Sequence, residues 1–190
     1  MPTEPLLLEL QQATERLAWL ECGELLGQLL EKIPPRETVL LAAAELNQCL
    51  PIFEKYRPKV KWPRAALQQL SLAEPLPEDF DFSPEVEGAN PIITHFIEGL
   101  DWLDAAVNDQ AKPHICANEC NRVILSAVNS RRYEYFAKLF PNDWRIVVKR
   151  EAGAEDLPPM KSRFMSESAV EDYTAGLWRS LAATIAERLG

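Results

Sequence analysis

The sequence predicts an all-α protein that folds as a single helical domain of about six to eight helices. Apolar residues recur at spacings of three, four and seven along most of the chain, which is the period of amphipathic helices. Only residues 144–150 resemble a strand, and one strand cannot form a sheet. With 190 residues, 47 % of them hydrophobic, the chain is long enough to bury a substantial core.

Leucine and proline positions define the helices expected in the first 73 residues. Before Pro34, an amphipathic stripe is formed by Leu6, Leu10, Leu17, Leu20, Leu25 and Leu29. Pro34 and Pro35 end this stretch, and a proline in the first turn suits the start of the next helix. Pro51 falls within that helix and predicts a kink or a break. A shorter helix is expected over 62–73.

Residues 73–91 have a different composition, with four prolines, six acidic residues and no basic residue. The segment shows no helical period, so we expect a linker or an ordered irregular loop. Helical periodicity resumes at Pro91 and runs through Val107, and a further helix is expected over 115–140, with a break near 129–130.

The strand-like run at 144–150 contains Ile146, Val147 and Val148 in succession. We expect it either to pair with a short partner strand or to lie extended over the helices. The final helix is expected from about residue 168 and ends in glycine at 190.

A short sequence pattern occurs twice, as ERLAWLECG at 15–23 and EGLDWLDAA at 98–106. Extended without gaps, segments 15–58 and 98–141 share eight identities in 44 positions, where chance gives about three. One interpretation is an internal repeat of helix pairs joined through 73–91. The other is that two amphipathic helices share apolar positions because all such helices do.

The net charge is −9 and is unevenly distributed. Residues 1–110 hold 19 acidic and 8 basic residues, whereas 111–190 hold 10 acidic and 12 basic residues. This balance argues against nucleic acid as the main partner, because phosphate binding requires clustered lysine and arginine.

Neither a basic leader nor a long apolar segment is visible in the sequence. The longest purely apolar run is Val39–Ala44, far below the roughly 20 residues that cross a bilayer. Four cysteines are too few and too scattered for a disulfide framework. We therefore expect a cytoplasmic protein with no membrane partner.

Two clusters contain metal-ligand residue types. His114, Cys116, Glu119 and Cys120 lack the paired spacing of zinc sites, so we expect both cysteines to be buried among Ile124 and Ala127. The second cluster is His95 with Glu98 and Asp101.

Nucleophile-elbow, phosphate-loop and dinucleotide-binding motifs do not occur in the sequence. We predict no cofactor. A metal-dependent helical enzyme that uses either of the two clusters stays as the alternative from another class.

The segment RRYEYFAKLF at 131–140 separates by helical period into two faces. A core stripe is predicted from Tyr133, Phe136, Ala137 and Phe140. Arg131, Tyr135 and Lys138 are expected to point elsewhere, and Tyr135 beside Arg131 and Arg132 is a candidate contact patch.

The candidate partner-binding residues are acidic and aromatic. Glu98, Asp101 and Asp104 follow one another at three-residue intervals and are expected to form an acidic ridge on a helix. Phe80 and Phe82 alternate with carboxylates in a segment shortly before that helix (Glu78, Asp79, Phe80, Asp81 and Phe82). Carboxylates of this kind steer a basic protein and aromatic residues supply affinity, although the ridge could also be only a solvated face.

The sequence therefore favours a non-enzymatic cytoplasmic binding protein that presents an acidic helical surface to a basic protein. An immunity or antitoxin-like inhibitor of a basic enzyme is the most concrete form of this hypothesis. The alternative within the same class is an accessory chaperone for a peptide or protein client.

Overall fold

The computed structural model describes residues 3–82, 90–151 and 167–189, which form nine helices without a strand. This confirms the all-α class and the single helical domain. The helices are α1 (Thr3–Glu15), α2 (Trp19–Leu30), α3 (Pro35–Asn47), α4 (Leu50–Tyr56), α5 (Trp62–Leu70), α6 (Pro91–Asn108), α7 (Pro113–Leu139), α8 (Pro141–Glu151) and α9 (Ser168–Leu189).

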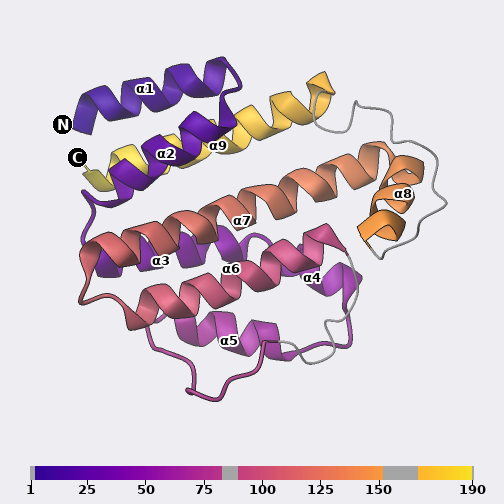
Figure 1. Cartoon of the computed structure of the whole chain (residues 1–190), viewed down its shortest axis with the longest axis horizontal. Helices are drawn as coiled ribbons and strands as arrows, with labels where there is room; N and C mark the ends of the chain where they lie inside the picture. The colour runs from indigo at the N-terminus through magenta and orange to yellow at the C-terminus, as the bar shows by residue number, and fades with distance from the viewer. Residues whose placement is uncertain (1–2, 83–89, 152–166, 190) are drawn as a thin grey trace.

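Helix α7, with 27 residues, is the centre of the fold. It packs against α6 and α3 on one side and against α2 and α9 on the other, while α8 folds back near its end (Figure 1). Helix α1 lies across α2 and α9, and α4 and α5 pack against α6. The long helix therefore separates an α1–α2–α9 layer from an α3–α4–α5–α6 layer.

Prolines begin most of the helices, as the sequence predicts. Proline occupies the first or second position of α3, α4, α5, α6 and α7, where its missing N–H has no intrahelical partner to lose. Pro51 stands at the start of α4, so the predicted break is confirmed. At the start of α6 the side chain of Asn90 accepts a hydrogen bond from the Ile92 N–H at 3.1 Å.

The leucine stripe before Pro34 was predicted correctly except at the junction of α1 and α2. Leu17 adopts a positive φ of 57° between the two helices, which changes the chain direction. Leu17 and Leu20 are therefore exposed, by 42 % and 80 %, whereas the other four leucines of the stripe are buried. The turn supplies one of the additional helix boundaries that bring the number of helices to nine.

The strand expected at 144–150 is wrong, because these residues belong to α8. Trp144 and Val147 stand three positions apart on one helix face and are both buried, so an apolar stripe at helical spacing outweighs the β-branched run. The break expected near 129–130 is also wrong. Helix α7 is continuous there, and the Ser130 hydroxyl donates to the Ile92 carbonyl of α6 at 3.1 Å.

Most buried side chains form one core around α7, and a smaller cluster lies next to α8. Phe53 and Phe96 pack in the main core with ring centroids 4.9 Å apart. Gly99 lets α6 approach α3 closely, because a Cβ at this position would lie 2.7 Å from the Leu46 Cδ1 atom. Glycine at position 99 thus sets the spacing of these helices.

The helix boundaries lend the proposed repeat no support. At an offset of 83 residues, the α2–α3 connection at 31–34 aligns with residues 114–117, the first turn of α7, and not with the α6–α7 connection at 109–112. Trp19 begins α2 and donates to Glu171 on α9, whereas Trp102 lies within α6 beneath the guanidinium of Arg122. The repeat therefore stays a prediction about the sequence.

Candidate binding surfaces

A hydrogen bond joins the two parts of the predicted acidic surface. The backbone N–H of Leu76 donates to the Asp104 carboxylate at 2.9 Å, so the segment after α5 is attached to α6. Glu78, Asp79 and Asp81 are exposed on this segment. Among the described residues, neither Glu78 nor Asp79 forms an ion pair. This hydrogen bond thus holds the start of the acidic segment, at residue 76, against α6.

Phe80 and Phe82 do not project freely from this segment. Both rings pack edge-on against Trp62 at the start of α5, with centroids 5.5 and 6.1 Å away, and against each other at 5.0 Å. Both are half-buried on the rim of the main core. Their first role is to fix the acidic segment onto α5, and only their remaining exposed edges could contact a partner.

The predicted ridge on α6 is only partly exposed. Glu98 and Asp101 are exposed, whereas Asp104 is half-buried because it holds the Leu76 N–H. Glu98 also contacts a neighbour on its own helix, with 3.1 Å between its carboxylate and the Nδ1 atom of His95. Partial burial, and then the negative charge of Asp104, raise the pKa of Asp101 above its usual value. A cation beside Asp101 would relieve this repulsion.

The cysteines occupy the places that the sequence predicts. Cys116 and Cys120 are fully buried and free, like Cys22 and Cys49. Burial raises the pKa of the Cys49 thiol to about 12, which keeps it protonated and unreactive. These thiols therefore act as small apolar side chains of the core.

The two histidine clusters are not brought together. His114, at the start of α7, is mostly exposed and pairs with Glu31 just after α2 at 2.5 Å. His95 instead stacks on Tyr133, near the other end of α7. Within residues 3–82, 90–151 and 167–189, no group of three or more His, Cys, Asp or Glu side chains is arranged to hold a metal ion. The described helices also include none with the length and apolar character of a membrane span.

The expectation that Arg131 points away from the core is wrong. Arg131 and Arg132 are 9 % and 7 % exposed. Arg131 reaches α3, where it donates to the Glu45 carboxylate at 2.7 Å and the Gln48 side-chain oxygen at 2.6 Å. Since the partners lie more than 80 residues away, helical period alone cannot reveal such pairs.

Arg132 makes the second buried ion pair, on the opposite side of α7. It donates to one oxygen of the Glu171 carboxylate at 2.9 Å, and the indole N–H of Trp19 donates to the other oxygen at 2.7 Å. Glu171 therefore links α2, α7 and α9. Tyr135, the third member of the predicted contact patch, stacks on Tyr173 of α9 with centroids 4.2 Å apart.

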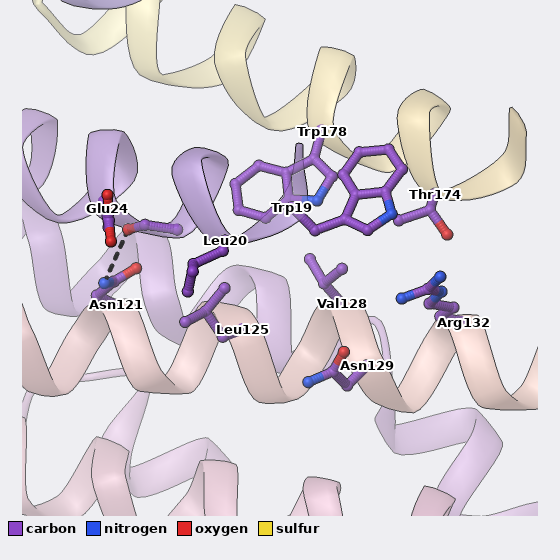
Figure 2. Close-up of a pocket in the computed structure, with 11 residues that line it drawn as sticks. Trp19, Leu20, Glu24, Asn121, Leu125, Val128, Asn129, Arg132, Thr174 and Trp178 are labelled. Atoms are coloured by element: carbon purple, nitrogen blue, oxygen red, sulfur yellow. Dashed lines mark hydrogen bonds between the residues drawn. The ribbon is translucent and has the colours of Figure 1, made fainter. Parts of the chain in front are cut away.

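Next to this network is a groove that the sequence did not reveal. It has a volume of about 450 Å³ and lies between α2, α7 and α9 (Figure 2). The apolar part of its wall comes from Trp19, Leu20, Leu125, Val128 and Trp178, and the polar part from Glu24, Asn121, Asn129, Arg132 and Thr174. We call it the α2–α7–α9 groove.

Two glycines on α2 allow this helix to approach α7 closely beside the groove. A Cβ on Gly23 would lie 3.4 Å from Leu125, and one on Gly27 would lie 3.2 Å from the Asn121 amide nitrogen. The same amide donates to the Gly23 carbonyl at 3.1 Å. The four-residue spacing of these glycines is the one sequence signal that could have located this helix crossing.

Comparison of the chain with protein-family models, with curated proteins and with solved structures found no match.

Proposed function

We propose that the protein is a non-enzymatic binding protein that holds a basic segment of a partner protein on its acidic surface. The surface comprises Glu78, Asp79, Phe80, Asp81, Phe82, Glu98, Asp101 and Asp104. Its most concrete form is an immunity or antitoxin-like inhibitor, in which the acidic surface covers the basic substrate-binding face of an enzyme.

One observation carries the proposal. The hydrogen bond from the Leu76 N–H to Asp104 holds the segment that leads into residues 78–82 against α6, and both elements carry carboxylates of the proposed surface. Glu78, Asp79 and Asp101 form no ion pair with a described residue. Partial burial, and then the negative charge of Asp104, raise the pKa of Asp101, and the second of these causes reflects a local excess of negative charge. A basic partner would neutralise this excess.

The test uses four substitutions that leave Asp104 in place. The variant E78Q/D79N/E98Q/D101N removes exposed carboxylates from the acidic surface. A matched control, E9Q/E15Q/E37Q/E187Q, removes the same number of exposed carboxylates elsewhere and gives the same net charge. Proteins captured by the wild-type chain and by both variants are identified by mass spectrometry, and the affinity of each purified partner is measured at low and moderate salt.

We expect one basic protein to bind the wild type and the control, and to bind the surface variant less tightly and with a flatter salt dependence. Each exposed charge contributes about 0.2–1 kcal/mol, so four together give a readily measured loss. If the control lost the same affinity, the effect would come from the net charge of the protein and not from this surface. Equal affinity in all three proteins would mean that the acidic surface is only solvated.

A further inference from the structure

The α2–α7–α9 groove contains polar groups that the fold leaves without partners. The Asn121 side-chain oxygen is enclosed and accepts no hydrogen bond from the described residues. The half-buried side-chain amide of Asn129 also makes none within the described part of the chain, and this residue of α7 lines the groove (Figure 2). By contrast, the Glu171 carboxylate is fully engaged by Trp19 and Arg132. Two carboxamides of the groove wall therefore have side-chain hydrogen-bonding capacity that no described residue uses.

The two carboxamides are spaced to match an extended peptide backbone. Asn121 and Asn129 are eight residues apart on α7, which places them about 12 Å apart along the helix axis. An extended chain advances about 3.3 Å per residue, so this distance spans about four residues. The backbone groups of an extended chain alternate between its two edges from one residue to the next. At a separation of four residues, both carboxamides would therefore face the same edge of the peptide. A side-chain amide offers both a donor and an acceptor, which suits a peptide group better than it suits a purely apolar ligand.

The rest of the groove selects the side chains of such a peptide. Between the two asparagines lies Leu125, opposite Trp19 and Leu20 of α2, so an apolar side chain fits the middle of the groove (Figure 2). Leu20 is 80 % exposed and has unburied apolar surface to offer. Glu24 is exposed at the edge and forms no ion pair with a described residue. Its charge favours a cationic neighbour.

From these features we propose that the α2–α7–α9 groove binds an extended peptide segment of another protein, with a large apolar side chain against Leu125 and Trp19 and an adjacent lysine or arginine beside Glu24. This site is separate from the acidic surface, which is built on α5 and α6, and the inference does not rest on the proposed function. Peptide capture is the activity that an accessory chaperone would need.

The experiment uses the full chain and four synthetic peptides of about seven residues, built on an alanine–glycine frame. One carries a central leucine–lysine pair, one leucine–glutamate and one serine–lysine. The fourth is the leucine–lysine peptide with N-methylated backbone amides, which removes its hydrogen-bond donors. Binding is followed by the NMR shifts of backbone amides in α2, α7 and α9, with α5 as the internal reference.

We expect the leucine–lysine peptide to bind with a Kd of about 0.1–1 mM and to shift resonances around the groove. The leucine–glutamate and serine–lysine peptides should bind about two- to tenfold more weakly, and the N-methylated peptide by about tenfold or more. Equal affinity of all four peptides overturns the proposal, as does the absence of any groove shift at millimolar peptide. Shifts that depend only on protein concentration would assign the groove to a second copy of the chain and overturn it as well.

Variants provide an independent arm. Glu24→Gln should reduce the preference for lysine over glutamate by about two- to fivefold, whereas Glu37→Gln, an exposed glutamate on α3, should not. Asn129→Ala should weaken the leucine–lysine peptide by about fivefold, and Asn118→Ala, an exposed asparagine on the same helix, should leave it unchanged. All four positions are at least partly exposed, so these variants should fold. Identical behaviour of each variant and its control would overturn the assignment of these two residues.

Discussion

Replacement of Gly99 by alanine tests whether this residue sets the α3–α6 spacing. The new Cβ would lie 2.7 Å from Leu46 Cδ1 and 3.5 Å from Ser126 Cβ, whereas carbon atoms in contact prefer about 3.5–4.0 Å. Leu46 is fully buried, so its side chain has little room to withdraw. Excess volume of this kind costs about 1–3 kcal/mol of folding free energy.

Alanine also has an intrinsic advantage that must be separated from this cost. It favours a helix over glycine by about 0.8–1.0 kcal/mol, so the net loss at position 99 should be about 0–2 kcal/mol. Gly176 on α9 is the matched control, because nothing lies within 4 Å of a Cβ placed there. Gly176→Ala should raise the free energy of unfolding by up to about 1 kcal/mol. The difference between the two variants measures the packing term.

Urea denaturation followed by circular dichroism gives both values, provided that the m-value stays constant. The double variant G99A/L46A provides a further check. In the Leu46→Ala background, the alanine at 99 should no longer be harmful, which corresponds to a coupling energy of about 0.5–3 kcal/mol. If Gly99→Ala stabilises the wild type as much as Gly176→Ala does, the close approach of α3 and α6 is not what requires glycine.

Four further predictions concern three of the charged side chains described above and the cysteines of α7. Asp104→Ala should destabilise the protein by about 1 kcal/mol, because the Leu76 N–H loses its acceptor, whereas Asp104→Asn keeps a side-chain oxygen there and should cost less; amide exchange at residue 76 reports the bond directly. Since burial and its acidic neighbour raise the folded-state pKa of Asp101, its ionised form destabilises the fold above that pKa, and the cost vanishes as the pH falls below the unfolded value. Asp101→Asn should therefore stabilise by a few tenths of a kcal/mol at about pH 7 and not at about pH 3; denaturation midpoints that do not depend on pH in this way would contradict it. Arg131→Met should cost about 3 kcal/mol because it strands the buried Glu45 carboxylate, and a second change of Glu45 to Gln should recover part of it; an uncoupled double variant would argue against the pair. The two cysteines of α7 should react with a thiol reagent only as fast as the protein unfolds, and rapid labelling under native conditions would contradict their burial.

The fold class followed from the sequence because helical periodicity and proline positions act locally. Pro51 ends one helix and starts the next whatever packs nearby, so its effect was predictable. The helix at 144–150 was not predictable in this way, because three successive β-branched residues favour a strand. Only the tertiary structure shows that a helix buries Trp144 and Val147 together on one face. The turn at Leu17 requires a positive φ, which leucine rarely adopts, so the sequence did not predict this turn.

The candidate surfaces were predictable to different extents for the same reason. Glu98 and Asp101 are exposed, as the sequence predicts, because charged side chains usually face water. The three-residue spacing of these carboxylates could not show that Asp104 accepts a hydrogen bond from the backbone N–H of Leu76. The α2–α7–α9 groove arises where three helices from distant parts of the chain meet, so its lining residues share no local pattern.

The central position of α7 has a consequence for folding during translation. Helices α2, α3 and α6 all pack against residues that are synthesised after them, and α1 packs against α9, which emerges last. A nascent chain that ends before residue 113 carries the apolar faces of these helices without the helix that covers them. Folding must therefore wait until most of the chain has been translated, and in that interval the exposed faces are open to aggregation or to a holding chaperone. Truncated chains that end at the α6–α7 connection should be insoluble. Nascent chains that are stalled on the ribosome after α9 has emerged should contain a folded domain.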